Sequence, residues 1–151
     1  MSLTNNNIVF RKLLVSDYNT NYLNLMNQLS TIDKENITYE DFNNFINSLN
    51  LNHEIYVLDD IKNNKIVGSG TIIIENKIIH NFGKVVHIED IVVDEDERGR
   101  GYGKIIIDHL VNIGSIRNCY KTILNCRGYN EDFYIKCGFK RHGESVMAIY
   151  Y

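Results

Sequence analysis

Three glycines at alternate positions stand among three cations in the middle of the chain, in the segment Arg98, Gly99, Arg100, Gly101, Tyr102, Gly103 and Lys104. Glycine permits positive φ angles and lets the backbone approach a ligand closely. The apolar run 85–93 predicts a strand before this segment, and the amphipathic run 105–113 predicts a helix after it. The first amides of such a helix lack partners and carry the positive end of its dipole. The segment therefore predicts a loop that binds a pyrophosphate.

Two common phosphate-binding motifs do not fit this loop. Ile105 follows the Gly-Lys pair where a Walker A loop has Ser or Thr, and Lys104 occupies the third glycine position of the dinucleotide fingerprint. Glycines alone are also compatible with a solvated turn, so the specific signal is the strand, loop and helix together. That combination resembles the coenzyme A signature of the GNAT acetyltransferases. In this signature Arg or Gln is followed by any two residues, then Gly, then any one residue, and then Gly or Ala. Arg98, Gly101 and Gly103 match it.

Two consecutive acids, Glu89 and Asp90, interrupt the apolar strand predicted over 85–93. Strict alternation would place their side chains on opposite faces, and buried carboxylates without partners are costly. An exposed edge strand explains one such acid and not both, so a functional role is favoured. The two acids would bind polar groups and the amine of an acceptor, and one would accept the amine proton. Backbone groups for the pantetheine arm and the thioester oxygen would come from Ile91, Val92 and Val93.

Composition is that of an ordinary globular protein, with 151 residues, 44% apolar and 23% charged, and we expect a single domain over 1–151. The net charge of −3 gives no reason to expect nucleic acid as a partner. The sequence has neither a membrane-spanning apolar run nor a signal-peptide pattern, and we expect a cytoplasmic protein. The three cysteines lack metal-site spacing and favour structural thiols, so no metal is expected.

Periodicity predicts a mixed α/β arrangement. Strands are expected over 8–13, 54–58, 65–74, 85–93, 120–126, 139–142 and 146–150, and helices over 17–29, 38–49, 105–113 and 130–137. Asp17 is a candidate N-cap of the first helix, and Thr38 with Asp41 forms a capping box on the second. The order favours a central mixed sheet with helices on both faces. It is also the order of the GNAT fold, so the resemblance covers nearly the whole chain.

Four strings narrow the resemblance to the GNAT branch that acetylates the 2-amine of glucosamine 6-phosphate on the route to UDP-N-acetylglucosamine. They are 72–80, 87–93, 118–126 and 133–139. The resemblance implies acetyl-CoA as cosubstrate, direct transfer in a ternary complex, and a homodimer whose sites lie near the subunit boundary. Tyr134 falls where this branch has the tyrosine that protonates the departing thiolate, which a phenol can do because the two pKa values are close. The alternative for Tyr134 is simple packing against Phe133.

The resemblance also implies ligand-binding residues outside the glycine loop. For the acceptor they are Ser30, Lys77, His80, Tyr120 and Lys121, together with Glu89 and Asp90. For the cofactor they are Asn125, Arg127 and Asn130. The cations and hydroxyl donors at the acceptor positions suit a phosphate monoester.

The chain departs from this branch at two positions. Asn125 replaces an acid in the predicted strand 120–126, and an amide cannot take up a proton at neutral pH. The chain ends in Tyr150 and Tyr151 where the branch has an arginine that reaches the phosphate across a dimer, and Arg141 is the candidate substitute. Two alternatives therefore stay open. One is acetylation of another amino sugar or small amine, and the other is a catalytically silent CoA-binding module.

Overall fold

A computed structural model describes residues 7–143 and 146–150. The strands are β1 (Ile8–Lys12), β2 (His53–Asp60), β3 (Lys65–Asn76), β4 (Lys84–Val93) and β5 (Lys121–Leu124). The α-helices are α1 (Tyr22–Leu29), α2 (Tyr39–Ser48), α3 (Ile79–Phe82), α4 (Tyr102–Ile116) and α5 (Glu131–Lys136). Short 3-10 helices are η1 (Val15–Asn19), η2 (Lys34–Asn36), η3 (Glu95–Glu97) and η4 (Gly128–Asn130).

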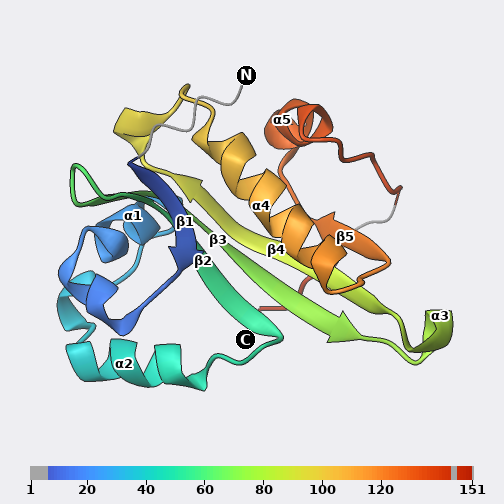
Figure 1. Cartoon of the computed structure of the whole chain (residues 1–151), viewed down its shortest axis with the longest axis horizontal. Helices are drawn as coiled ribbons and strands as arrows, with labels where there is room; N and C mark the ends of the chain where they lie inside the picture. The colour runs from blue at the N-terminus through green and yellow to red at the C-terminus, as the bar shows by residue number, and fades with distance from the viewer. Residues whose placement is uncertain (1–6, 144–145, 151) are drawn as a thin grey trace.

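The strands form one sheet in the order β1-β2-β3-β4-β5 (Figure 1). All neighbours are antiparallel except β4 and β5, which run parallel. Their pairing begins at Val85 with Lys121 and stops at Ile88 with Leu124, although β4 continues to Val93. The two strands therefore part halfway along β4, and this fork lies beside the glycine-rich loop.

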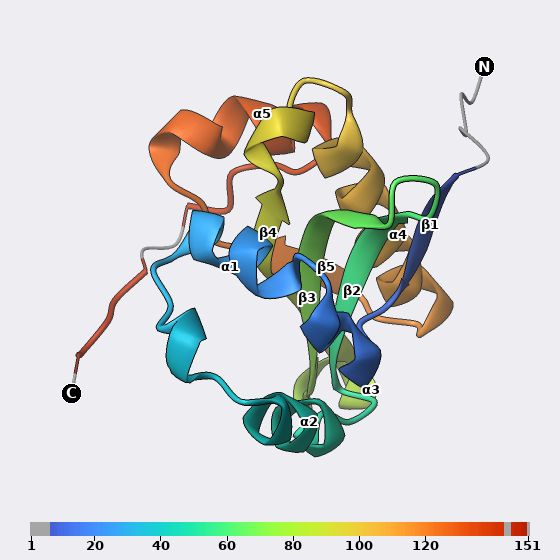
Figure 2. The same cartoon turned by 90° about the vertical axis from the view of Figure 1, so that its left-hand side faces the viewer.

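Helices cover both faces of the sheet, as predicted. On one face α4 packs on the sheet through Ile106, Ile107 and Leu110, which are fully buried. On the other face Leu25 of α1 and Phe42 of α2 form a second core with residues of β2 and β3. Figure 2 shows α1 and α2 on the side of the sheet away from α4. The predicted mixed α/β class is confirmed.

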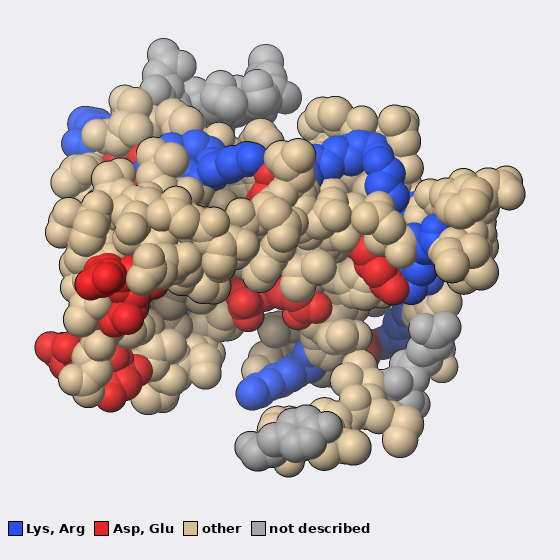
Figure 3. All heavy atoms as spheres, turned by 90° about the horizontal axis from the view of Figure 1, so that it is seen from below, with Lys and Arg blue, Asp and Glu red and all other residues tan. Residues whose placement is uncertain are grey.

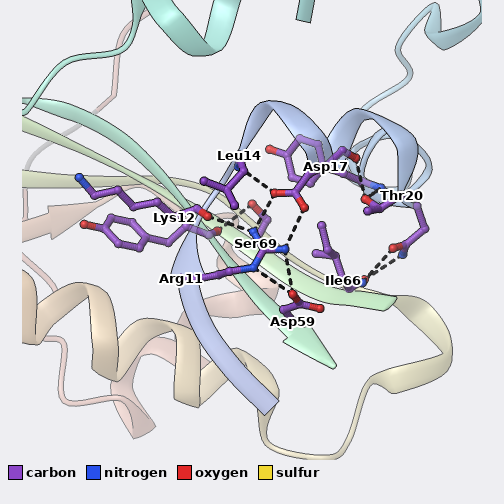
Figure 4. A network of polar contacts seen from close by, with 11 residues as sticks. Arg11, Lys12, Leu14, Asp17, Thr20, Asp59, Ile66 and Ser69 are labelled. Atoms are coloured by element: carbon purple, nitrogen blue, oxygen red, sulfur yellow. Dashed lines mark hydrogen bonds and ion pairs between the residues drawn. The ribbon is translucent and has the colours of Figure 1, made fainter. Parts of the chain in front are cut away.

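The predicted N-cap at Asp17 is wrong, although its carboxylate has a structural role. Asp17 lies inside η1, where it accepts a hydrogen bond from the Leu14 amide at 2.8 Å. The guanidinium of Arg11 donates to both of its oxygens at 2.8 Å and also contacts Asp59 (Figure 4). Because this cluster fixes the chain between β1 and η1, helix α1 starts later, at Tyr22. The capping box at Thr38 is confirmed, since its side chain accepts from the Asp41 amide.

The two predicted closing strands, 139–142 and 146–150, are wrong for the residues that the structure describes. No strand follows α5 in residues 137–143 or 146–150. Apolar side chains of the last segment are instead exposed, at 70% for Val146, 93% for Met147, 80% for Ile149 and 94% for Tyr150. A strand needs a neighbour with which to pair, and the described part of one chain does not supply it. The position of Tyr151 lies outside the described residues.

Candidate active site

The glycine-rich loop leads directly into α4, as predicted. Gly101 is the N-cap of α4 with φ of 82° and has no side-chain cap, and Gly99 has φ of 80°. No described atom lies within 4 Å of the place where a Cβ would stand on either glycine. Only glycine adopts these angles without strain, and the first amides of α4 are left for a ligand. Gly103 serves packing instead, because its Cβ would stand 3.1 Å from Cζ of Phe133.

A cavity of about 430 Å³ lies against this loop. Most of the residues predicted to bind the cofactor line it, namely Ile91, Val93, Arg98, Gly99, Gly101, Tyr102, Gly103, Lys104 and Asn130. Phe133 and Tyr134 of α5 complete the lining. Arg98 donates to the Val93 carbonyl at 3.2 Å, and Lys104 pairs with Asp108 at 2.7 Å. Arg98 is therefore held against the end of β4, and Lys104 against the first turns of α4.

Four of the predicted cofactor residues do not line this cavity, namely Val92, Arg100, Asn125 and Arg127. Val92 is 5% exposed and packs in the core beneath α1. Arg100 pairs with Glu97 at 2.8 Å, and Glu97 in turn contacts Lys65. On the face drawn in Figure 3, Lys and Arg side chains lie mostly along the upper part, and Asp and Glu side chains form groups across the middle and at the lower left.

A second cavity, of about 290 Å³, opens at the fork between β4 and β5. The predicted acids Glu89 and Asp90 line it, together with Asn125, Arg127 and Asn130. Ile91, Asn130 and Tyr134 line both cavities, so the two spaces adjoin. The sequence predictions placed Asn125 and Arg127 at the cofactor, whereas these two residues line the cavity that contains the acids.

A β-bulge explains how both acids reach one cavity. Asp90 has φ of 52°, and the register with β3 shifts between the pairs Ser69–Val92 and Thr71–Glu89. Ile88 and Ile91 both pack on the core beneath α4, although they are three positions apart and would lie on opposite faces of a regular strand. The prediction of opposite faces assumed strict alternation and is wrong here, because a bulge inserts one extra residue into β4.

Tyr134 lies at the junction of the two cavities. Its ring packs edge-on against Phe133, with centroids 5.0 Å apart, and against Phe139, at 6.1 Å. Burial, followed by the nearby Cys126, Cys137 and Glu89, raises the pKa of Tyr134 above its ordinary value of 10.0. The phenol is therefore protonated at neutral pH. Packing and a chemical role are compatible, because the same ring contacts Phe133 and lines both cavities.

The other predicted acceptor residues lie apart from both cavities. Lys77 pairs with Glu75, and the His80 ring lies 4.3 Å from that of Tyr120. Lys121 stands 5.9 Å above the Tyr120 ring, at the end of β5 remote from the fork. Ser30 follows Leu29, which lines the acid-containing cavity. Apart from Ser30, these side chains lie near the β3–β4 connection.

Sequence reasoning missed several residues of the acid-containing cavity, namely Leu29, Ile88, Leu124, Cys126 and Tyr129. Cys126 and Tyr129 flank Arg127, so their proximity to a predicted residue was the available signal. Leu29 carries no such signal, because an apolar residue at a helix end looks like any core residue.

The fold and this pair of cavities define the class of protein. The chain belongs to the acetyltransferase (GNAT) family, and its match to that family spans residues 18–139. The predicted family and fold are thereby confirmed. Within the described residues, no helix is long and apolar enough to cross a membrane, and no cluster of three or more His, Cys, Asp or Glu side chains could hold a metal ion.

Several similar proteins share one name. The chain is 40% identical to glucosamine 6-phosphate N-acetyltransferase 1 of Dictyostelium discoideum, over 99% of this chain and 94% of that protein. It is 38% identical to glucosamine 6-phosphate N-acetyltransferase of Candida albicans, over 92% and 93% of the two chains. The crystal structure of glucosamine-6-phosphate N-acetyltransferase from Arabidopsis thaliana superimposes with a TM-score of 0.85 at 35% identity, covering 95% and 97%.

Proposed function

We propose that this chain transfers the acetyl group of acetyl-CoA to the 2-amine of glucosamine 6-phosphate, giving N-acetylglucosamine 6-phosphate. The relatives of that name support the choice of acceptor. The single structural observation that carries the proposal is the pair of adjoining cavities, one against the glycine loop and one containing two carboxylates, which share Ile91, Asn130 and Tyr134.

The residues around the loop fit coenzyme A. The left-handed glycines and the free amides at the start of α4 suit its diphosphate, and Arg98 and Lys104 supply positive charge. Ile91 and Val93 line the cavity at the loop, and Ile91 also lines the cavity at the fork. Bound there, acetyl-CoA supplies an activated acetyl group as a thioester.

The chain's own residues would then act on the acceptor in a ternary complex. Glu89 or Asp90 holds the amine and takes its proton as the nitrogen forms a bond to the acetyl carbon. A backbone amide near Ile91 stabilises the oxyanion that develops on the carbonyl oxygen. As the C–S bond breaks, the Tyr134 hydroxyl donates its proton to the departing thiolate. Positioning the two substrates side by side supplies a large part of the rate enhancement.

Thiol release from acetyl-CoA tests this function, with glucosamine 6-phosphate, glucosamine and other amino sugars as acceptors. We expect turnover to be fastest with glucosamine 6-phosphate. Preference for an unphosphorylated amine would favour the alternative acceptor. CoA binding without turnover of any acceptor would favour the silent binding module.

We also propose that the chain acts as a homodimer and as a single domain in the cytoplasm. Support for the dimer comes from exposed apolar side chains in two places, the C-terminal segment (Val146, Met147, Ile149 and Tyr150) and the β3–β4 connection (Ile78, Ile79 and Phe82). Large exposed apolar patches commonly mark protein interfaces. Light scattering should give twice the protomer mass of 17.6 kDa. Limited proteolysis and cell fractionation test the domain and the location.

A further inference from the structure

The acid-containing cavity presents opposite charges on its two sides. Glu89 and Asp90 come from β4, and Arg127 comes from the turn that follows β5. Among the described residues that line this cavity, Arg127 is the one cation. A ligand that fits such a space carries a positively charged group toward the acids and an anionic group toward the guanidinium.

Arg127 also differs from most other arginines in its partners. Within the described part of the chain, each of four arginines pairs with a carboxylate, namely Arg11, Arg100, Arg117 and Arg141. The two that form no such pair there are Arg98, in the loop cavity, and Arg127. The recorded hydrogen bond of Arg127 runs from Nη1 to the Tyr129 hydroxyl at 3.3 Å. A guanidinium has five N–H donors, so most of its donors are left for a ligand.

We infer that Arg127 binds the phosphate of the acceptor while Glu89 and Asp90 bind its amine. This inference rests on the proposed function and assigns the anion partner within that site. A guanidinium matches two phosphate oxygens at once, which fixes direction as well as position. Held at both ends, the sugar presents its amine toward Tyr134 and the loop cavity. Arg127 is thus the residue that selects phosphorylated over unphosphorylated amino sugars.

The other candidate phosphate ligands are less well placed in this chain. Arg141 is exposed and its Nε donates to Glu131 at 2.7 Å, and it does not line the cavity. Lys77, His80 and Lys121 lie at the far end of the β4–β5 pair. Arg127 lines the cavity with the acids and not the cavity at the loop, which separates its role from binding of the cofactor diphosphate.

The test compares two acceptors in two variants. Arg127→Gln removes the charge, and Arg127→Lys keeps the charge but loses the bidentate geometry. For Arg127→Gln we expect kcat/KM for glucosamine 6-phosphate to fall roughly 10- to 100-fold, as for loss of a charged hydrogen bond, with little change for glucosamine. Arg127→Lys should be intermediate. Lys136→Gln, at an exposed cation on α5, is the matched control and should change neither acceptor.

Calorimetric titration with glucosamine 6-phosphate in the presence of CoA separates this inference from the proposed function. Binding to the wild type that weakens in Arg127→Gln supports the inference even if turnover fails, whereas absence of turnover alone refutes the function. Equal losses for both acceptors would overturn the inference. So would a raised KM for acetyl-CoA without loss of acceptor discrimination, or a selective loss in Arg141→Gln and not in Arg127→Gln. Thermal melting checks that each variant is folded.

Discussion

Gly70 on β3 faces the bulge in β4, and Gly70→Ala should disturb both stability and catalysis. A Cβ at this position would stand 2.6 Å from Cδ1 of Ile91, 2.8 Å from Cδ1 of Leu110 and 3.1 Å from Cγ2 of Ile106. Ile106 and Leu110 are fully buried, so their methyl groups cannot swing into solvent. Ile91 must therefore move, and with it the backbone that lines both cavities.

This geometry sets the size of the stability loss in Gly70→Ala. Overpacking of a well-packed core costs roughly 1–3 kcal/mol. Replacing glycine by alanine also lowers the entropy of the unfolded chain, which stabilises the folded state by about 0.4–1 kcal/mol. The net destabilisation is then about 1–2 kcal/mol, which for a chain of this length lowers Tm by roughly 2–8 °C.

Thermal melting and steady-state kinetics measure both effects. Gly128→Ala is the matched control, because no described atom lies within 4 Å of its Cβ position and its φ is not positive. Adding Ile91→Val removes the methyl group that Gly70→Ala meets at 2.6 Å, and the double variant should recover part of the lost stability. A Gly70→Ala variant with unchanged Tm and unchanged kcat would refute the assignment of Gly70 as the residue that accommodates the bulge.

Three further changes test the site and its support. Tyr134→Phe should lower kcat by about 10²–10⁴-fold with CoA affinity nearly unchanged. Because the pKa of Tyr134 is raised above its ordinary value of 10.0, loss of the phenol proton should lower the wild-type kcat only above pH 10.0. Asp90→Asn should lower kcat/KM for the sugar by roughly 10-fold or more while CoA binding stays near normal. Burial alone would raise the pKa of Glu54, but hydrogen bonds from Lys12 and Arg117 lower this pKa below its ordinary value of 4.5. The Glu54 carboxylate therefore stabilises the fold above pH 4.5, and this contribution is lost as the pH falls through the lowered pKa. Glu54→Gln should flatten this acid dependence in urea titrations.

Each of these expectations has a contrary result. Unchanged turnover in Tyr134→Phe would remove its role as proton donor. An equal loss of CoA and sugar binding in Asp90→Asn would indicate a disturbed bulge, since the left-handed φ of 52° at this residue is tolerated by Asn as well as Asp. A Glu54→Gln variant with the same acid dependence as the wild type would show that other carboxylates govern it.

The sequence predicted most of the fold because its local patterns agree with the tertiary structure. The run 72–74 lies in β3, the central strand, and the capping box at Thr38 starts α2 as expected. The glycine loop was recognisable because each of its residue types has a physical reason at its position. Patterns failed where a tertiary contact decided the outcome, as at Asp17, which the Arg11 guanidinium holds inside η1.

The acceptor side was less predictable, because its geometry depends on one irregularity. Strict alternation along β4 predicts that the side chains of Glu89 and Asp90 lie on opposite faces of the sheet. The residues of β4 themselves contain no signal for an inserted residue. The signal lies on the partner strand, where Gly68 and Gly70 leave room for the side chains of Ile106 and Ile91. A glycine in a strand interior often marks such a bulge, but which neighbour needs the space is set by strand pairing.

Asn125 shows how the bulge and the chemistry depend on each other. Its amide lines the same cavity as Glu89 and Asp90 but cannot take up a proton, so in the proposed mechanism the acceptor amine loses its proton to one of those two acids. A regular strand would have turned one of them away from the cavity. Because the bulge directs both toward it, one carboxylate can orient the ammonium while the other receives the proton. The amide at 125 then avoids a third negative charge close to the first two, which would have weakened the attraction of Arg127 for an anionic substrate.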